Sequence, residues 1–286
     1  MTPPRPLTQR GAEAVHSLSA TRGKGGQAIP GTSEREAEGK TPDYALLQRA
    51  LEPLSVDALE RAFRVLPSLV DADAAFLARN ACGIVAERLS WPDASALHHA
   101  LGREGIQTEV IPQERLLNLP PAKKLKRADC LPQALLLYDP VGRPTEIGWS
   151  HVVVVAAGQV NLTEFTRFTK QRVLHRGAYG EEPTVVSEHH TKEERNSRLV
   201  LDLVLDVAPP RYRAQGDKFF YNYLGPRLQS DRTANFCSLV RDLIRYAPEA
   251  AQNRGAAGIS EEPPRLLRYL GEHSFESETR WLLWHG

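Results

Sequence analysis

The sequence has few cysteines and no long apolar run. Only three cysteines occur in 286 residues, and this odd, small number argues against a disulfide framework and for free thiols in a reducing compartment. The longest apolar run, Val152 to Ala157, falls far short of the ~20 residues that a membrane span needs. The first residues, starting Thr2-Pro3-Pro4, lack the apolar centre of a secretory signal. We therefore expect a cytoplasmic protein without a membrane partner.

Several binding motifs are also missing. No Cys-x-x-Cys or His-Glu-x-x-His spacing occurs, and the adjacent pairs His98-His99 and His189-His190 would point about 100° apart on a helix, so no metal site is predicted. No Gly-x-Gly-x-x-Gly or Walker loop implies a nucleotide, and we expect no cofactor. The net charge of +1 gives no indication of a nucleic-acid partner. The oligomeric state stays open.

The composition divides the chain near residue 40. Residues 1–40 are rich in Gly, Pro, Ser, Thr and charge, which predicts a disordered leader. Residues 41–286 are predicted to form a single α+β domain of a catalytic type, whose C-terminal part, from about residue 210, is helical. Helices come first, then mostly antiparallel strands, then helices again, and this order favours α+β over an alternating parallel sheet.

Local patterns predict the individual elements. Helical spacing of apolar residues and helix start signals predict helices over 41–54, from 55, over 72–89 with a break near 80–82, over 91–101, over 231–246 and over 266–270. Alternation or β-branched runs predict strands at 106–111, 131–138, 152–156, 185–186 and 199–207. Residues 116–128, with the basic run Lys123, Lys124, Lys126 and Arg127, are predicted to be an exposed loop; a solvated charge run or an attraction for an acidic partner would explain these charges.

One stretch carries most of the chemical information. His151 opens a run of four valines, Ala157-Gly158-Gln159 looks like a hairpin turn, and Asn161 opens the next apolar run. This pattern predicts two paired strands with His151 on one and Asn161 on its neighbour. An imidazole in that position can take and return a proton, and a side-chain amide can hold its other nitrogen.

Cys82 supplies a candidate nucleophile upstream of this histidine. We expect it at the start of a helix, where unpaired amides lower the pKa of a thiol. Gly83 would let a substrate backbone approach, and Asn80 and the Cys82 amide are candidate donors to an oxyanion. The alternative is that Cys82 is a small buried hydrophobic residue. Cys130 is a rival nucleophile, whereas Cys237 lies on an apolar helix face and is predicted to be core.

The order Cys82, His151, Asn161 resembles the papain-like cysteine superfamily, and within it the transglutaminase-like branch. The resemblance covers roughly residues 80–168, and its most specific part is His151, Gly158, Asn161, Leu162 and Thr163. It implies a papain-like fold with Cys82 as nucleophile, His151 as base and Asn161 as orienter. Asn replaces the Asp that is usual in transglutaminase-like members, and no Gln precedes Cys82 as papain-like proteases require.

The resemblance implies a cysteine-dependent hydrolase or acyl transferase that acts on a carboxamide or peptide bond through a thioester. Peptidase, deamidase and transglutaminase-like activities are all compatible with it, with a protein or peptide as substrate. The alternative function is a catalytically inactive binding or scaffold protein on the same fold.

Overall fold

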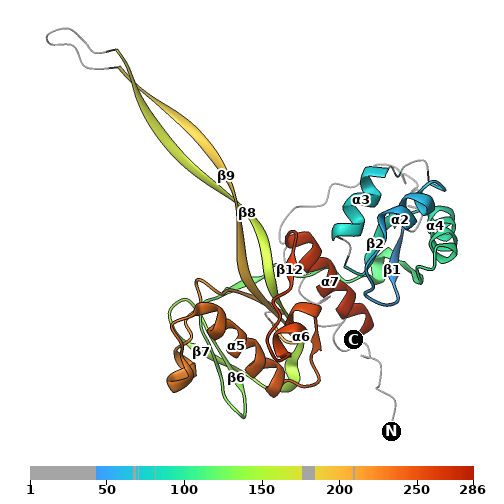
Figure 1. Ribbon diagram of the computed structural model, residues 1–286. Coiled ribbons are helices and arrows are strands. Elements are labelled where there is room, and N and C mark those ends of the chain that lie inside the picture. The colour runs from blue at the N-terminus through green and yellow to red at the C-terminus, as the bar shows by residue number, and fades with distance from the viewer. Residues whose placement is uncertain (1–42, 67–68, 70, 81, 176–183, 209) are drawn as a thin grey trace, which may run out of the picture.

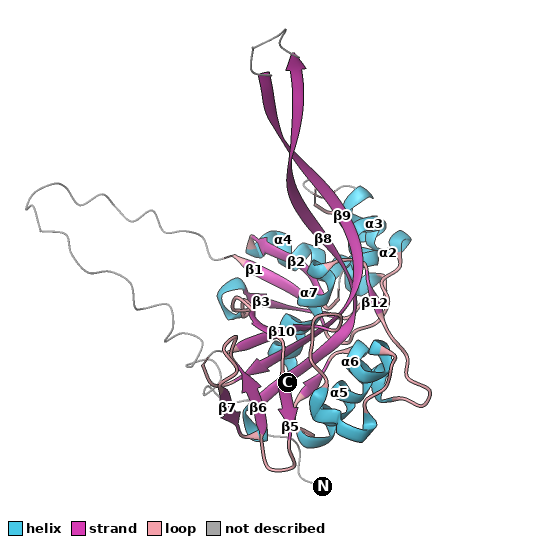
Figure 2. Ribbon diagram, turned by 90° about the vertical axis from the view of Figure 1, so that its left-hand side faces the viewer, coloured by secondary structure: helices cyan, strands magenta, loops and turns pink. Residues whose placement is uncertain are grey.

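The computed structural model describes residues 43–66, 69, 71–80, 82–175, 184–208 and 210–286. Side chains are described for all of these except 71–72, 80, 164–175 and 184–195. The leader predicted over residues 1–40 lies outside the described residues. The described chain combines helices with several sheets (Figures 1 and 2), which confirms the α+β class.

The first part of the chain is a small antiparallel sheet with helices packed against it. The sheet has the strand order β2-β1-β3, and its apolar side packs on the helices through Leu46, Leu59, Phe63, Val85 and Leu97. Its elements are β1 (Tyr44–Gln48), α2 (Val56–Phe63), α3 (Asp71–Asn80), β2 (Ile84–Leu89), α4 (Trp91–Arg103) and β3 (Thr108–Pro112).

The rest of the chain is built on a larger sheet. The main path runs β11-β8-β9-β10-β4, with β12 also paired to β8, and a second sheet has the order β5-β6-β7. The elements are β4 (Lys123–Leu125), β5 (Ala128–Cys130), β6 (Leu135–Tyr138), β7 (Pro144–Ile147), the 3-10 turn η3 (Trp149–His151), β8 (Val152–His175), β9 (Thr184–Leu205), β10 (Arg211–Gln215), the 3-10 segment η4 (Asn222–Arg227), α5 (Arg232–Tyr246), β11 (Ala251–Gln252), α6 (Arg254–Ser260), β12 (Arg268–Tyr269) and α7 (Glu272–His285).

Strands β8 and β9 extend far beyond the body of the protein. They pair antiparallel from Val152↔Leu205 out to His175↔Thr184. Strands β10, β11 and β12 pair only with the inner part, as far out as Val160 on β8 and Val200 on β9. The outer part stands clear of the body as a two-stranded ribbon in both views (Figures 1 and 2).

Helix α7 joins the two parts of the chain. It lies between the small sheet and the larger sheet (Figure 1). Arg280 pairs with Glu87 of β2 at 2.7 Å, and the Trp281 indole donates to the Gln48 carbonyl of β1 at 2.7 Å. On its other side, Phe275 is fully buried against the larger sheet. The C-terminal helix is thereby docked on both sheets.

Several sequence predictions of local structure are confirmed. Helices α2, α4 and α5 lie where the helical spacing placed them. Asp231 caps α5 by accepting the Thr233 amide at 2.8 Å, and Ser90 caps α4 by accepting the Asp93 amide at 3.3 Å. Both caps are of the type that satisfies the unpaired amides of a first helical turn.

Other predictions are wrong. The segment predicted as a helix over 41–54 contains strand β1, and the helix predicted over 266–270 contains strand β12. The loop predicted over 116–128 holds β4, an edge strand of the larger sheet. The turn predicted at Ala157-Gly158-Gln159 does not exist, because β8 continues straight through it. Gly158 is required there because a Cβ would collide with the Tyr269 ring.

No helix among the described residues is both long enough and apolar enough to cross a membrane.

Candidate functional site

Cys82 does not begin a helix, contrary to the prediction. Helix α3 ends at Asn80 and strand β2 begins at Ile84, so Cys82 lies just beyond the C-terminal end of a helix. That end carries the negative pole of the helix dipole, which disfavours a thiolate rather than stabilising it. The expected activation by helix amides is therefore absent at this position.

The environment of Cys82 keeps its thiol neutral. The side chain is 7% exposed and belongs to an apolar cluster with Val154, Val160 and Phe275. Its sulfur accepts an N–H from Arg254 at 3.1 Å. Burial, reinforced by the nearby carboxylate of Glu278, raises the pKa of the thiol from 9.0 to about 11.

Gly83 serves packing rather than substrate approach. Its φ of +93° lies in the left-handed region that favours glycine, and a Cβ at this position would overlap the Trp281 side chain. The Gly83 carbonyl also accepts the Gln48 amide at 2.7 Å. The space that a substrate backbone would need is thus filled by α7.

His151 has a carboxylate partner, but it is not the predicted one. Its Nδ1 lies 2.8 Å from Oδ1 of Asp206, and its backbone carbonyl accepts the Asp206 amide at 3.1 Å. The histidine side chain is 46% exposed. This pair closes the inner end of the β8–β9 ladder, and the alternation of 199–207, with Asp202 and Asp206 on one face, was the sequence signal for it.

Asn161 lies too far from His151 to orient it. The two residues do not lie on neighbouring strands. His151 immediately precedes β8, and Asn161 lies ten residues further along, within β8 itself. At about 3.3 Å per residue this separates them by roughly 30 Å. Asn161 is exposed and stands opposite Ser197 of β9. Asn80, the second oxyanion candidate, is the last residue of α3, and its side chain lies outside the described ones.

The structure does not assemble the predicted triad. Among the described contacts, the sulfur of Cys82 bonds to Arg254, the ring of His151 bonds to Asp206, and neither bonds to the other or to Asn161.

The other two cysteines are also unactivated. Cys130 is 8% exposed, and burial raises the pKa of its thiol to about 12. Cys237 is 6% exposed on the inner face of α5, which confirms its prediction as core. Neither presents a thiolate for nucleophilic attack at neutral pH.

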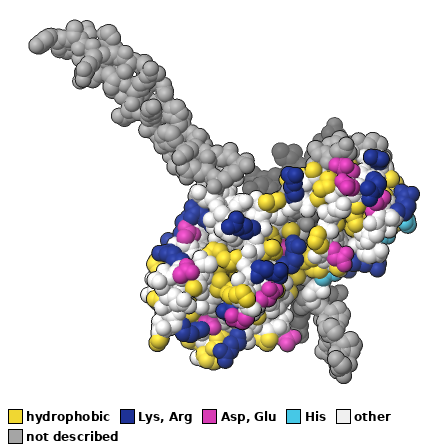
Figure 3. All heavy atoms as spheres, viewed as in Figure 1, with side chains coloured by type: hydrophobic (Ala, Val, Ile, Leu, Met, Phe, Trp, Pro, Cys, Tyr) yellow, Lys and Arg dark blue, Asp and Glu magenta, His cyan; other side chains and the backbone are white. Residues whose placement is uncertain are grey.

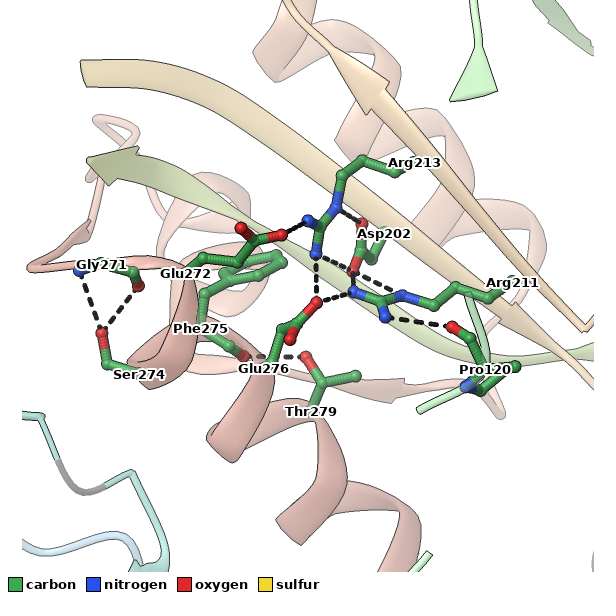
Figure 4. A network of polar contacts seen from close by, with 10 residues as sticks. All are labelled: Pro120, Asp202, Arg211, Arg213, Gly271, Glu272, Ser274, Phe275, Glu276 and Thr279. Atoms are coloured by element: carbon green, nitrogen blue, oxygen red, sulfur yellow. Dashed lines mark hydrogen bonds and ion pairs between the residues drawn. The ribbon is translucent and has the colours of Figure 1, made fainter. Parts of the chain in front are cut away.

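A buried ion-pair network lies where β9 and β10 meet α7 (Figure 4). Asp202 is fully buried and accepts from Arg211 at 2.6 Å and from Arg213 at 2.7 Å. Both guanidiniums also reach α7, where Glu276 bonds to each of them and Glu272 bonds to Arg213. Sequence analysis missed this network, although Arg-Tyr-Arg at 211–213 is the alternation that places two cations on one face of a strand.

A second buried cluster surrounds Glu278. This carboxylate is fully buried and accepts from the Arg254 amide at 2.6 Å, from the Arg254 guanidinium at 3.1 Å and from the Tyr269 hydroxyl at 3.0 Å. Asn253 donates to the Tyr269 oxygen at 2.8 Å and also bonds to both backbone groups of Ala157 in β8. Each charge is paired, and such a network fixes α6, β12 and α7 on β8.

Two further features bear on binding. A hollow of about 260 Å³ at the start of α5 is lined by Gln229, Cys237, Arg241 and Pro264 among others, and none of the predicted triad residues lines it. Within the described part of the chain, no group of three or more His, Cys, Asp or Glu residues could hold a metal ion.

No protein-family model matches this chain, and no curated protein is similar to it.

Proposed function

We propose that this protein is a non-catalytic binding protein, in which a compact body carries a projecting two-stranded ribbon that contacts a protein partner. The observation that carries this proposal is the state of Cys82: 7% exposed, bonded to Arg254 and beside the buried carboxylate of Glu278. Burial raises the pKa of this thiol to about 11, so the thiol is neutral at pH 7. Such a neutral, buried thiol does not supply the nucleophile that thioester formation requires.

The outer part of β8 and β9 supports a binding role. A two-stranded ribbon on its own is at best marginally stable in water, and its outer strand edges pair with no other described strand. Open strand edges are sites where a partner chain adds a strand. The three free cysteines support a reducing, cytoplasmic setting for this interaction.

The cysteine hydrolase or acyl transferase of the papain-like, transglutaminase-like type is the second candidate function. One observation favours it, namely the exposed His151 with its Asp206 partner, which has the geometry of a base and its orienter. Peptidase, deamidase or transfer chemistry would require Cys82 to leave Arg254 and reach this pair.

Thiol labelling separates the two candidates. Iodoacetamide is added to the folded protein between pH 6 and pH 10, and peptide mapping by mass spectrometry follows Cys82. We expect slow labelling at neutral pH that rises only toward pH 10, with the same rate in the His151→Ala variant. Rapid labelling of Cys82 below pH 7 that disappears in His151→Ala would overturn the proposal and favour the enzyme.

A further inference from the structure

The lysines whose side chains are described lie close together in the fold of the body. Of the eight lysines in the sequence, four have described side chains, and these are Lys123, Lys124, Lys126 and Lys218. All four are exposed and lie on or next to strand β4 and the segment after β10. Apart from histidines, every other basic side chain described on the body is an arginine.

Backbone contacts bring these residues together. The Phe220 amide donates to the Lys126 carbonyl at 2.8 Å, and Arg127 forms a parallel bridge with Phe220. Strand β4 runs parallel to β10 with Lys123 beside Tyr212. We use the name β4 surface for Lys124, Lys126, Arg127, Lys218 and Phe220.

The lysines of the β4 surface have no acidic partner among the described side chains. The nearby carboxylates are already engaged: Asp129 bonds to Arg127 and to the Tyr138 hydroxyl, and Asp217 bonds to Arg198. Several arginines of the body do form ion pairs, as the Asp202 network illustrates. Figure 3 shows one face of the molecule, on which basic and acidic side chains are interspersed.

An apolar anchor stands within this charge. Phe220 is 57% exposed although its neighbour Phe219 is 4% exposed. Exposed aromatic side chains flanked by charge are typical centres of protein interfaces. The rings of Tyr138 and Tyr212 are each covered by a cation, Arg127 at 4.0 Å and Lys123 at 5.7 Å, so Phe220 is the ring of this group that remains open to a ligand.

We propose that the β4 surface binds an acidic polypeptide segment that carries an apolar residue, with carboxylates at Lys124, Lys126 and Lys218 and the apolar residue on Phe220. Charge complementarity argues for an anionic partner. A polypeptide fits better than a nucleic acid, because a single open ring offers no row of stacking platforms and the whole chain has a net charge of only +1. This inference rests on the proposed binding function, since it names a partner for it.

Lysines also protect the exposed edges of sheets from aggregation without binding anything. That role accounts for Lys124 on the edge strand β4 and for Lys126 just after it, but it does not account for the exposed Phe220 beside them.

Fluorescence anisotropy with the full chain tests the proposal. The probe is a labelled ten-residue peptide of Asp and Glu with one central Leu, compared with the same peptide with Ser in place of Leu. We expect saturable binding of the Leu peptide that weakens with salt, and about tenfold weaker binding by Lys124→Glu/Lys126→Glu and by Phe220→Ser. The matched control Arg64→Glu/Arg103→Glu makes the same change in net charge at exposed sites just after α2 and at the end of α4, and it should bind as the parent does.

The outcomes are distinct. The proposal is overturned if the peptide does not bind, if the Arg64/Arg103 control weakens binding equally, or if a labelled oligothymidylate binds at this surface more tightly than the peptide. Because all the substituted side chains are exposed, thermal unfolding of each variant should match the parent. Loss of peptide binding would not change the rate at which Cys82 is labelled. Failure of this inference can therefore be distinguished from failure of the proposed function, which the labelling experiment tests.

Discussion

Gly83 is the residue on which the contact between the small sheet and α7 depends. Its backbone adopts a left-handed conformation with φ of +93°, and the Trp281 side chain fills the space beside its Cα. Gly83→Ala would strain the backbone and force the indole aside, so we expect it to lower the free energy of unfolding by about 3 kcal/mol. Urea denaturation followed by tryptophan fluorescence measures this change.

Gly102 provides the control for that substitution. It lies in helix α4, and no atom approaches within 4 Å of the position of an added Cβ. Gly102→Ala should therefore raise the free energy of unfolding by roughly 0.5–1 kcal/mol, as expected for Gly to Ala in a helix. Equal destabilisation by the two variants would contradict the role given to Trp281.

The sequence did not predict which residues contact one another at the candidate site. Cys82, His151 and Asn161 have the residue types and the order of a catalytic triad, but order along a chain does not determine proximity. The partners that these residues actually have, Arg254 and Asp206, follow them by 172 and 55 positions. Only the strand pairing and the docking of α6 and α7 determine such contacts.

Elements were predicted well where the signal was local. Helices α4 and α5 have capping residues and amphipathic spacing within their own sequence. Strand β1 was missed because Leu46 and Leu47 are both fully buried, and a short apolar run buried on both faces cannot be told from a helix by periodicity. The continuity of β8 was missed because the reason for Gly158 is the ring of Tyr269, far along the chain.

The outer ribbon of β8 and β9 should be removable. Leu162 and Asn196 are register partners, so replacing residues 163–195 with Asn-Gly would close the strands with a two-residue hairpin turn. The ribbon stands clear of the body (Figure 2), and we expect the midpoint of thermal unfolding to change by less than about 2 °C. Differential scanning calorimetry measures this, and a fall of about 10 °C would mean that the ribbon stabilises the body.

On the scale of the whole molecule, acid should loosen the contact between the small sheet and α7. Hydrogen bonding from Arg280 holds the pKa of Glu87 below its ordinary value of 4.5. A carboxyl with a depressed pKa in the folded protein stabilises it fully above the unfolded pKa, and that stabilisation is lost as the pH falls through the folded pKa. The free energy of unfolding should therefore fall from about pH 4.5 downward.

The Glu87→Gln variant tests this assignment. Urea midpoints at pH 6, 5, 4 and 3 should fall less steeply with acid in Glu87→Gln than in the parent, because the variant cannot gain the proton. Glu114→Gln is the matched control, since Glu114 is exposed and has no ion pair among the described contacts, and its pH dependence should equal that of the parent. If the urea midpoints of Glu87→Gln and the parent fall in parallel with pH, protonation of Glu87 does not cause the loss of stability in acid.

At the scale of the whole molecule, the sequence indicated the fold class but not the arrangement of the sheets. Helices followed by strands and then helices predicted the α+β class, and that class is confirmed. The division into a small sheet and a larger one joined by α7 was not predicted, because it depends on Arg280, Trp281 and Trp284 reaching β1, β2 and β3 across more than 170 residues.

The position of α7 has a consequence for synthesis. The small sheet leaves the ribosome early, yet the helix that fills the space beside Gly83 and neutralises Glu87 emerges after every other described element. Until then, the apolar face of the small sheet that Trp281 and Trp284 cover stays exposed on the nascent chain. Stalled or prematurely terminated translation would therefore release a product with this face exposed, which makes it a substrate for chaperones and for degradation.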